Sequence, residues 1–88
     1  MFKLWGKEFA DGHMIADIVV KAEEGQSRTQ KVFECMDKIC REFDLQKPIW
    51  LDSIVHDFQV MNKARFYQDS FIEEIPFDFL EIQVLEDD

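Results

Sequence analysis

The sequence predicts one α+β domain over residues 1–88, in which an antiparallel sheet packs against one main amphipathic helix as a two-layer sandwich. Three observations predict it: two apolar runs joined by Asp-Gly, an amphipathic run that follows a capping box, and a strictly alternating run near the C-terminus. The sheet is expected to combine an N-terminal hairpin with a C-terminal strand. The predicted element order is β-β-α-α-(β)-β, and the bracketed element is an aromatic, extended run.

A β-hairpin is predicted at the N-terminus. Residues 2–9 and 14–21 are apolar-rich runs, and the segment between them contains Asp-Gly, which suits a two-residue turn with positive φ. Direct pairing across this turn sets Trp5 opposite Ile18, and we expect the face of this pair to be the buried one. The same face carries Phe9, Met14 and Val20, and the other face carries Leu4 and Val19.

The main helix is predicted over residues 27–43. Ser27 and Gln30 match a capping box, in which the Ser hydroxyl and the Gln side chain satisfy backbone N–H groups of the first turn. On a helical wheel the apolar residues that follow fall on one side, and charged residues fill the remainder. These apolar residues are Val32, Phe33, Cys35, Met36, Ile39, Cys40 and Phe43.

Three shorter elements are predicted in the second half of the chain. Asp52 can cap a short helix over residues 52–60. Residues 65–72 form the aromatic, extended run, and residues 80–84 alternate as a half-buried strand does. Phe79 falls on the opposite parity to the apolar residues of that strand, which suggests a bulge or a strand that starts after Phe79.

Composition indicates a folded cytoplasmic protein. Hydrophobic residues make up 47% of the chain and only three residues are glycine, which is far from a disordered composition. The sequence has no apolar stretch long enough to span a bilayer and no signal-peptide core, so no membrane association is expected. Cys35 and Cys40 point away from each other on the predicted helix and are expected to be free thiols in a reducing compartment.

The residues that could carry chemistry form no recognisable site. Structural metal sites usually bring their ligands in close pairs, and the two cysteines, His13 and His56 show no such spacing. Glycines are too few and too scattered for a phosphate-binding loop. We therefore expect a non-enzymatic protein with no metal, no cofactor and no catalytic residue. An unrecognised active site would use residues that share the second predicted helix, namely Asp52, His56 and Asp57.

Negative charge is concentrated in the last quarter of the chain. Residues 1–65 carry ten basic against eleven acidic residues, whereas residues 66–88 carry no basic residue and eight acidic ones, so most of the formal net charge of −9 lies there. A concentrated acidic surface repels nucleic acid and anionic membrane and favours basic partners, so direct nucleic-acid binding is not expected. The candidate interaction surface consists of Asp69, Glu73, Glu74, Asp78 and Glu81.

Three segments carry a resemblance to a group of sequences. They are PIWLD at residues 48–52, RFYQDSFIEE at residues 65–74 and FDFLEI at residues 77–82. With these segments the chain resembles a group of short uncharacterised bacterial proteins from Firmicutes, over most of its length. The resemblance implies a bacterial cytosolic origin and transfers no activity and no site residue.

Two binding functions follow from these patterns. The first is a small protein-interaction module whose exposed sheet edge or acidic aromatic face binds another protein or a second copy of itself. The alternative is an acidic nucleic-acid mimic, whose carboxylates between residues 69 and 88 stand in for phosphates and inhibit a basic nucleic-acid-binding protein. Salt distinguishes the two, because binding of the mimic would weaken steeply as ionic strength rises.

Overall fold

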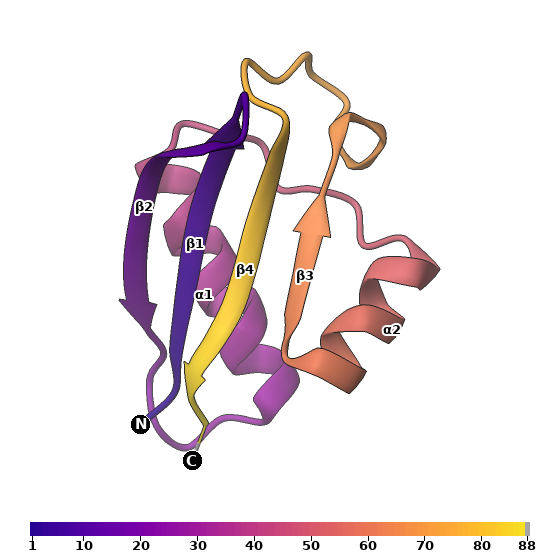
Figure 1. The fold of residues 1–88 in the computed structure, drawn as a ribbon. Coiled ribbons are helices and arrows are strands. Elements are labelled where there is room, and N and C mark those ends of the chain that lie inside the picture. Colours follow the sequence, from indigo (N-terminus) through magenta and orange to yellow (C-terminus); the bar gives the residue numbers. More distant parts are fainter. Residues whose placement is uncertain (88) are drawn as a thin grey trace.

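The computed structural model describes residues 1–87 and consists of a four-stranded antiparallel sheet with two helices. The elements, in chain order, are β1 (Lys3–Ala10), β2 (His13–Lys21), α1 (Arg28–Glu42), α2 (Asp52–Met61), β3 (Lys63–Phe66), a 3-10 turn (Gln68–Ser70) and β4 (Phe79–Glu86). The strands lie in the order β2-β1-β4-β3. Figure 1 shows α1 lying across one face of the sheet and α2 beside β3. The predicted fold class and element order are confirmed.

The core lies between the sheet and α1. The capping box of α1 forms as predicted: the Oγ of Ser27 accepts a hydrogen bond from the N–H of Gln30 at 3.2 Å, and the Gln30 side chain accepts one from the N–H of Ser27 at 3.1 Å. Phe33, at the margin of the predicted apolar face, is 54% exposed. The buried residues of α1 are Val32, Cys35, Met36, Ile39 and Cys40.

An extra residue in β2 changes the register of the hairpin. Beside the Asp-Gly turn Phe9 pairs with Met14, as direct pairing predicts. The next pair is Glu8 with Ala16, so Ile15 has no partner in β1 and forms a β-bulge. Every pair beyond the bulge is therefore displaced by one residue from the predicted register.

The bulge also decides which face of the hairpin is buried. Leu4 pairs with Val20, and both are buried on the side of α1. Trp5 pairs with Val19 on the opposite face, which no helix covers. Val20 and the half-buried Ile18 lie on the core side, as predicted, whereas the prediction was wrong for Trp5, Phe9 and Met14, which lie on the helix-free face.

The close packing of α1 on the sheet depends on Gly6 in β1. A Cβ atom at Gly6 would lie 2.8 Å from the Cγ2 atom of Ile39 and 2.9 Å from its Cδ1 atom. Any side chain larger than hydrogen would therefore displace Ile39, which is fully buried near the C-terminal end of α1. Glycine in a strand interior often marks such a close approach.

The second half of the chain departs from the predicted boundaries. Leu51, not Asp52, is the N-cap of α2, and no side chain of residues 1–87 forms a capping hydrogen bond at this end of the helix. Only Arg65 and Phe66 of the predicted extended run over residues 65–72 belong to a strand, because β3 begins at Lys63 and ends at Phe66. β4 begins at Phe79, whose parity is explained by its position on the helix-free face, where its ring stacks on Phe9.

Candidate functional site

The outer edge of β3 offers unpaired backbone groups. The N–H of Val84 donates to the carbonyl oxygen of Asn62 at 2.8 Å, so Asn62 and Val84 form a hydrogen-bonded pair of the antiparallel ladder between β3 and β4. Pair types alternate along the ladder, so Ala64 bonds to β4, whereas the N–H and C=O groups of Lys63 and Arg65 point to the free edge. No hydrogen bond recorded within residues 1–87 uses these outward groups.

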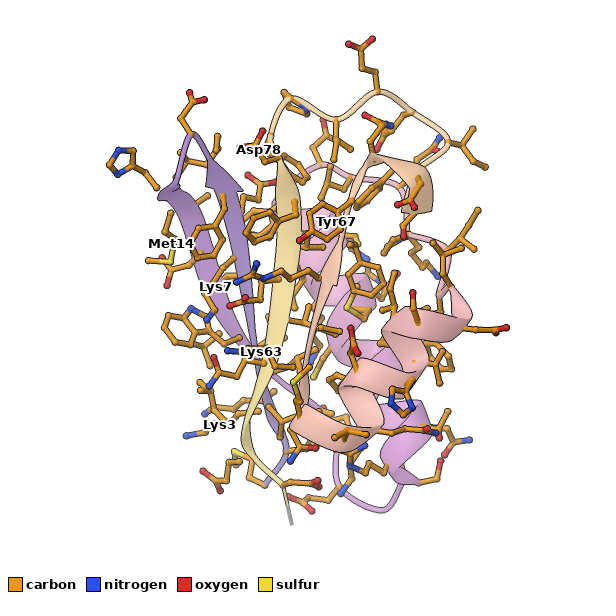
Figure 2. All side chains as sticks on the ribbon, turned by 45° about the vertical axis from the view of Figure 1, so that its right-hand side comes forward. Lys3, Lys7, Met14, Lys63, Tyr67 and Asp78 are labelled. Atoms are coloured by element: carbon orange, nitrogen blue, oxygen red, sulfur yellow. The ribbon has the colours of Figure 1, made fainter. Side chains whose placement is uncertain are left out.

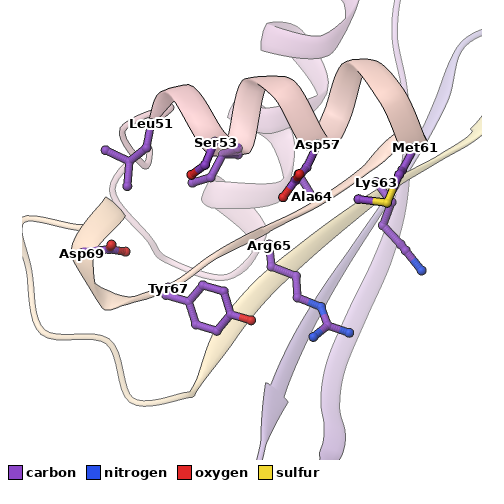
Figure 3. A pocket seen from close by; sticks show the side chains of 10 residues that line it. Leu51, Ser53, Asp57, Met61, Lys63, Ala64, Arg65, Tyr67 and Asp69 are labelled. Carbon is purple, nitrogen blue, oxygen red and sulfur yellow. The ribbon is translucent and has the colours of Figure 1, made fainter.

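A groove of about 320 Å³ lies along this edge, between β3 and α2. Figure 3 shows the helix on one side and the strand on the other, with Tyr67 and Asp69 at one end of the groove. The helix contributes Ser53, Ile54, Asp57 and Met61, Leu51 precedes it, and the strand contributes Lys63, Ala64 and Arg65.

The groove combines apolar and charged side chains. Leu51, Ile54 and Met61 supply apolar surface on the helix side. Asp57 and Asp69 are exposed, and neither carboxylate takes part in a hydrogen bond or an ion pair in the described part of the chain. Both carboxylates are therefore available to a ligand.

Arg65 connects the groove to a buried ion pair on the helix-free face of the sheet. Its Nε donates to Oε1 of Glu81 at 2.9 Å, and the Nζ of Lys7 lies 2.8 Å from Oε2 of the same carboxylate. Burial opposes ionisation of Glu81, but the hydrogen bonds and positive charges of Lys7 and Arg65 outweigh it and lower the pKa of this carboxyl below its ordinary value. The ion pair with Glu81 holds the Arg65 guanidinium on the helix-free face.

Aromatic rings cover the same face next to Arg65. The rings of Phe9 and Phe79 stack with centroids 5.0 Å apart, and Tyr67 lies 5.3 Å from Phe79. The guanidinium carbon of Arg65 lies 4.5 Å from the centre of the Phe79 ring. Figure 2 shows Lys7, Tyr67 and Met14 on this side of the sheet.

The predicted acidic surface is only partly assembled. Glu81 lies apart from the other four acids, buried at 4% exposure in the ion pair with Lys7. The remaining four lie at the end of the molecule that carries the hairpin turn and the loop over residues 71–78. They are Asp69, Glu73, Glu74 and Asp78.

Two of these four acids hold loops together. Oδ2 of Asp78 accepts a hydrogen bond from the N–H of Asp11 in the hairpin turn at 2.9 Å. Oε1 of Glu73 accepts one from the N–H of Gln46 in the segment after α1, also at 2.9 Å. These two carboxylates satisfy backbone N–H groups of neighbouring loops. A structural role therefore explains their positions without a binding partner.

The other candidate residues do not come together. No group of three or more His, Cys, Asp or Glu side chains that could hold a metal ion occurs among residues 1–87. Cys35 and Cys40 are free and buried, as expected. Asp52 and His56 are exposed on α2, and Asp57, on the same helix, lines the groove.

Comparison with models of known families, with curated proteins and with solved structures finds no match for the chain. Within the described residues no helix is long and apolar enough to cross a membrane.

Several groove residues were missed by sequence reasoning, among them Ser53, Met61 and Lys63. They belong to a helix and a strand that follow each other directly, but the groove exists only because β3 pairs with β4 and leaves its other edge beside α2. The available signal was the short polar junction at Asn62, which adopts a left-handed conformation with φ 56° and turns the chain back along the helix.

Proposed function

We propose that the chain is a non-enzymatic protein-interaction module that binds an extended segment of another protein along the outer edge of β3. The observation that carries the proposal is the row of outward backbone groups on Lys63 and Arg65 beside the groove. An extended segment placed there would add a fifth strand to the sheet, and main-chain hydrogen bonds would supply affinity.

The two walls of the groove predict how side chains of the bound segment would be read. Side chains alternate between the faces of a strand, so one row would meet Leu51, Ile54 and Met61 on the helix side. The other row would lie on the helix-free face beside Arg65 and Tyr67. Apolar residues at alternate positions of the partner segment are therefore expected.

Charge favours a basic partner. Asp57 and Asp69 line the groove and form no ion pair with any of residues 1–87, and the protein carries a formal net charge of −9. A lysine or arginine in the helix-facing row of the segment would reach one of these carboxylates. The field of the whole molecule would also speed the encounter with a cationic partner.

A displayed library of short random peptides provides the test. The strongest binder should shift the backbone amide resonances of Lys63 and Arg65 and slow their hydrogen exchange. Arg65→Pro removes the outward N–H without breaking a bond to β4, whereas Arg65→Ala keeps that N–H and is the matched control. We expect Arg65→Pro to bind about tenfold more weakly than Arg65→Ala, because one backbone hydrogen bond is lost. Equal affinities, or shifts confined to another surface, would refute the proposal.

The acidic-mimic alternative has one observation in its favour. Hydrogen bonds join the loop over residues 71–78 to the hairpin turn at Asp11 and to the segment after α1 at Gln46, so the exposed Asp11 and Asp44 belong to segments at the same end of the molecule. A mimic would lose its basic partner between low and moderate salt and would be weakened by Glu74→Gln. Binding at the β3 groove, which rests mainly on main-chain hydrogen bonds and apolar contacts, would weaken less with salt and would not change with Glu74→Gln.

We place this activity in the cytoplasm of a bacterium. The support is that Cys35 and Cys40 are free and buried, as cysteines of proteins in reducing compartments are. Cys35 and Cys40 are not placed to form a structural disulfide under oxidising conditions, because both are buried on the same helix.

A further inference from the structure

The opposite edge of the sheet, on β2, also carries outward backbone groups. The N–H of Ala22 donates to the carbonyl oxygen of Phe2 at 3.1 Å, which identifies the hydrogen-bonded pair type in the β1–β2 ladder. The alternation then directs the N–H and C=O groups of Asp17, Val19 and Lys21 to the free edge. Unlike the edge of β3, this edge has no helix beside it in Figure 1.

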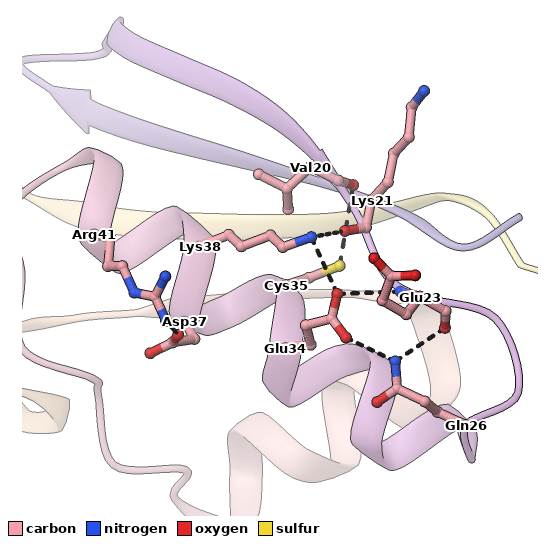
Figure 4. Close-up of polar contacts among 9 residues, drawn as sticks. All are labelled: Val20, Lys21, Glu23, Gln26, Glu34, Cys35, Asp37, Lys38 and Arg41. Atoms are coloured by element: carbon pink, nitrogen blue, oxygen red, sulfur yellow. Dashed lines mark hydrogen bonds and ion pairs between the residues drawn. The ribbon is translucent and has the colours of Figure 1, made fainter.

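The side chains on this edge have a symmetric charge pattern. Asp17, Val19 and Lys21 share the helix-free face. Asp17 lies two positions before Val19 and Lys21 two positions after it. The Asp17 carboxylate is held in place by the indole N–H of Trp5 at 2.9 Å. Lys21 is exposed, and Figure 4 shows its side chain pointing away from α1. Val19 between them is 48% exposed.

We propose that a second copy of this chain pairs with the edge of β2, antiparallel, about a two-fold axis through Val19. Val19 then faces Val19 of the second copy, and Asp17 of each copy faces Lys21 of the other. The outward backbone groups of the three residues meet their counterparts, and two four-stranded sheets join into one continuous sheet. This inference does not depend on the function proposed for the β3 groove.

Charge selects this register over its neighbours. If the axis passed through Asp17, the two Asp17 carboxylates would face each other, and if it passed through Lys21, the two ammonium groups would do so. Like charges directly opposite each other destabilise a strand pair, whereas opposite charges stabilise it. An axis midway, between Asp17 and Val19, would leave Asp17 facing a valine. Only the register centred on Val19 pairs both charged residues.

The same reasoning disfavours pairing of two β3 edges. A two-fold axis at β3 would bring Lys63 and Arg65 of one copy against the same two cations of the other. The α2 helix also lies beside that edge and leaves a groove for one segment. The two edges therefore differ: β3 suits an extended segment, and β2 suits a second copy.

Lys38 opposes part of this interface. Its Nζ donates to the carbonyl oxygen of Lys21 at 2.6 Å and also lies 3.0 Å from Oε2 of Glu34 (Figure 4). A carbonyl oxygen has two lone pairs, so Lys38 competes only for the bond that this oxygen would accept from Asp17 of the second copy. The bonds of Val19 and of the Lys21 N–H are unaffected. Strand pairing alone buries a small area, so the dimer is transient, with a dissociation constant above about 1 µM.

Sedimentation equilibrium of purified chain up to about 1 mM tests the proposal. Asp17→Lys alone and Lys21→Asp alone each set like charges opposite each other at both ends of the interface. We expect each to weaken dimerisation about tenfold. The double charge swap D17K/K21D again sets a lysine opposite an aspartate at both ends and should restore the dimer. Lys63→Asp, which changes a lysine on the other edge, is the control and should leave dimerisation unchanged.

A backbone variant tests the pairing independently of charge. Val19→Pro removes the outward N–H at the axis without removing a bond to β1, and it should abolish the dimer while circular dichroism stays native. A chain that stays monomeric at the highest concentration would overturn the proposal. So would a dimer that persists in Val19→Pro, or single charge variants whose defect the charge swap does not repair.

Discussion

Lys7 and Glu81 form an ion pair that is buried on a sheet face with no helix above it. Their exposed fractions are 7% and 4%. Neighbouring side chains cover the pair in place of a helix. The Nζ of Lys7 lies 3.9 Å from the centre of the Trp5 ring, and the Arg65 guanidinium, which stacks on the Phe79 ring, lies beside Glu81. Charges buried in this way stabilise the fold only while they are balanced. Without Glu81, Lys7 would keep no counter-charge, and without Lys7, Glu81 would keep only the half-exposed Arg65.

The ion pair predicts how stability depends on pH. The folded pKa of Glu81 lies below its ordinary value of 4.5, so the native state binds this proton less readily than the unfolded chain does. The stabilisation is present above the unfolded pKa and is lost as pH falls through the folded one. We expect the free energy of unfolding, measured by urea titration, to decrease as pH falls below 4.5.

Two variants separate this effect from general acid denaturation. Glu81→Gln leaves Lys7 buried without a counter-charge and should cost about 3 kcal/mol at neutral pH. The double variant K7M/E81L replaces the pair by apolar side chains and should cost less than Glu81→Gln alone. Its stability should also fall less steeply in acid than that of the parent. A parallel acid dependence of parent and double variant would assign the effect to other carboxyls.

At the scale of the elements, the contact between β1 and α1 has no tolerance for a side chain at Gly6. Gly6→Ala would place a methyl group within 3 Å of two Ile39 atoms, so α1 or Ile39 must move. We expect a loss of about 1–3 kcal/mol in unfolding free energy, measured by chemical denaturation.

Ile39→Ala provides the matched partner for a double-mutant cycle. Alone it opens a cavity in the core and should cost about 2–5 kcal/mol. Combined with Gly6→Ala it makes room for the added methyl group, so the double variant should be more stable than the sum of the two losses predicts. Additive losses would mean that the two positions do not meet in the folded protein.

Sequence signals between neighbouring residues predicted the helices and strands. Contacts between residues distant in sequence decided the strand register, the buried face and the strand lengths. The capping box at Ser27 and the Asp-Gly turn involve residues close in sequence, and both formed as predicted. The buried face of the hairpin was misassigned because one unpaired residue, Ile15, reverses parity, and nothing in the local sequence marks it. β3 was shorter than predicted because its extent is set by pairing with β4, a partner distant in sequence.

The candidate site was less predictable than the fold. The clustering of acids in the sequence predicts one acidic surface, and four of these carboxylates lie at one end of the molecule. Glu81 is instead buried on the helix-free face, because Lys7, which is distant in sequence, pairs with it across β1 and β4. The groove beside β3 depends on which strand ends up at the edge of the sheet, and this is a property of topology. The sequence predicts a free sheet edge as a binding surface, but only the strand order shows that β2 and β3 form the two edges.

For the molecule as a whole, the two cysteines report on opening of the entire core. Burial raises the pKa of both Cys35 and Cys40 to about 11, and both lie in the core, Cys35 in the middle of α1 and Cys40 in its last turn. At neutral pH only about one in ten thousand such thiols is ionised. We expect both to resist a thiol reagent in the native state and to react together at the rate of global unfolding, followed by mass spectrometry.

Denaturant supplies the comparison for this labelling. Both cysteines should react within the dead time of mixing once the chain is unfolded. Both thiols lie on α1, which is joined to the rest of the protein by a loop at each end. Fast modification of only one cysteine in the native protein would therefore show that one part of α1 opens locally, without global unfolding.

The strand order also sets the timing of folding. β1 and β4 form the centre of the sheet, and their pairing joins Lys3 to Glu86. A chain emerging from the ribosome can form the hairpin and α1 early, but β1 keeps an unpaired inner edge until β4 has been synthesised. The closing step therefore spans nearly the whole chain, which makes it slow relative to helix formation. During synthesis the nascent protein exposes the very edge that the finished sheet conceals, and that interval is when it is most exposed to misassembly.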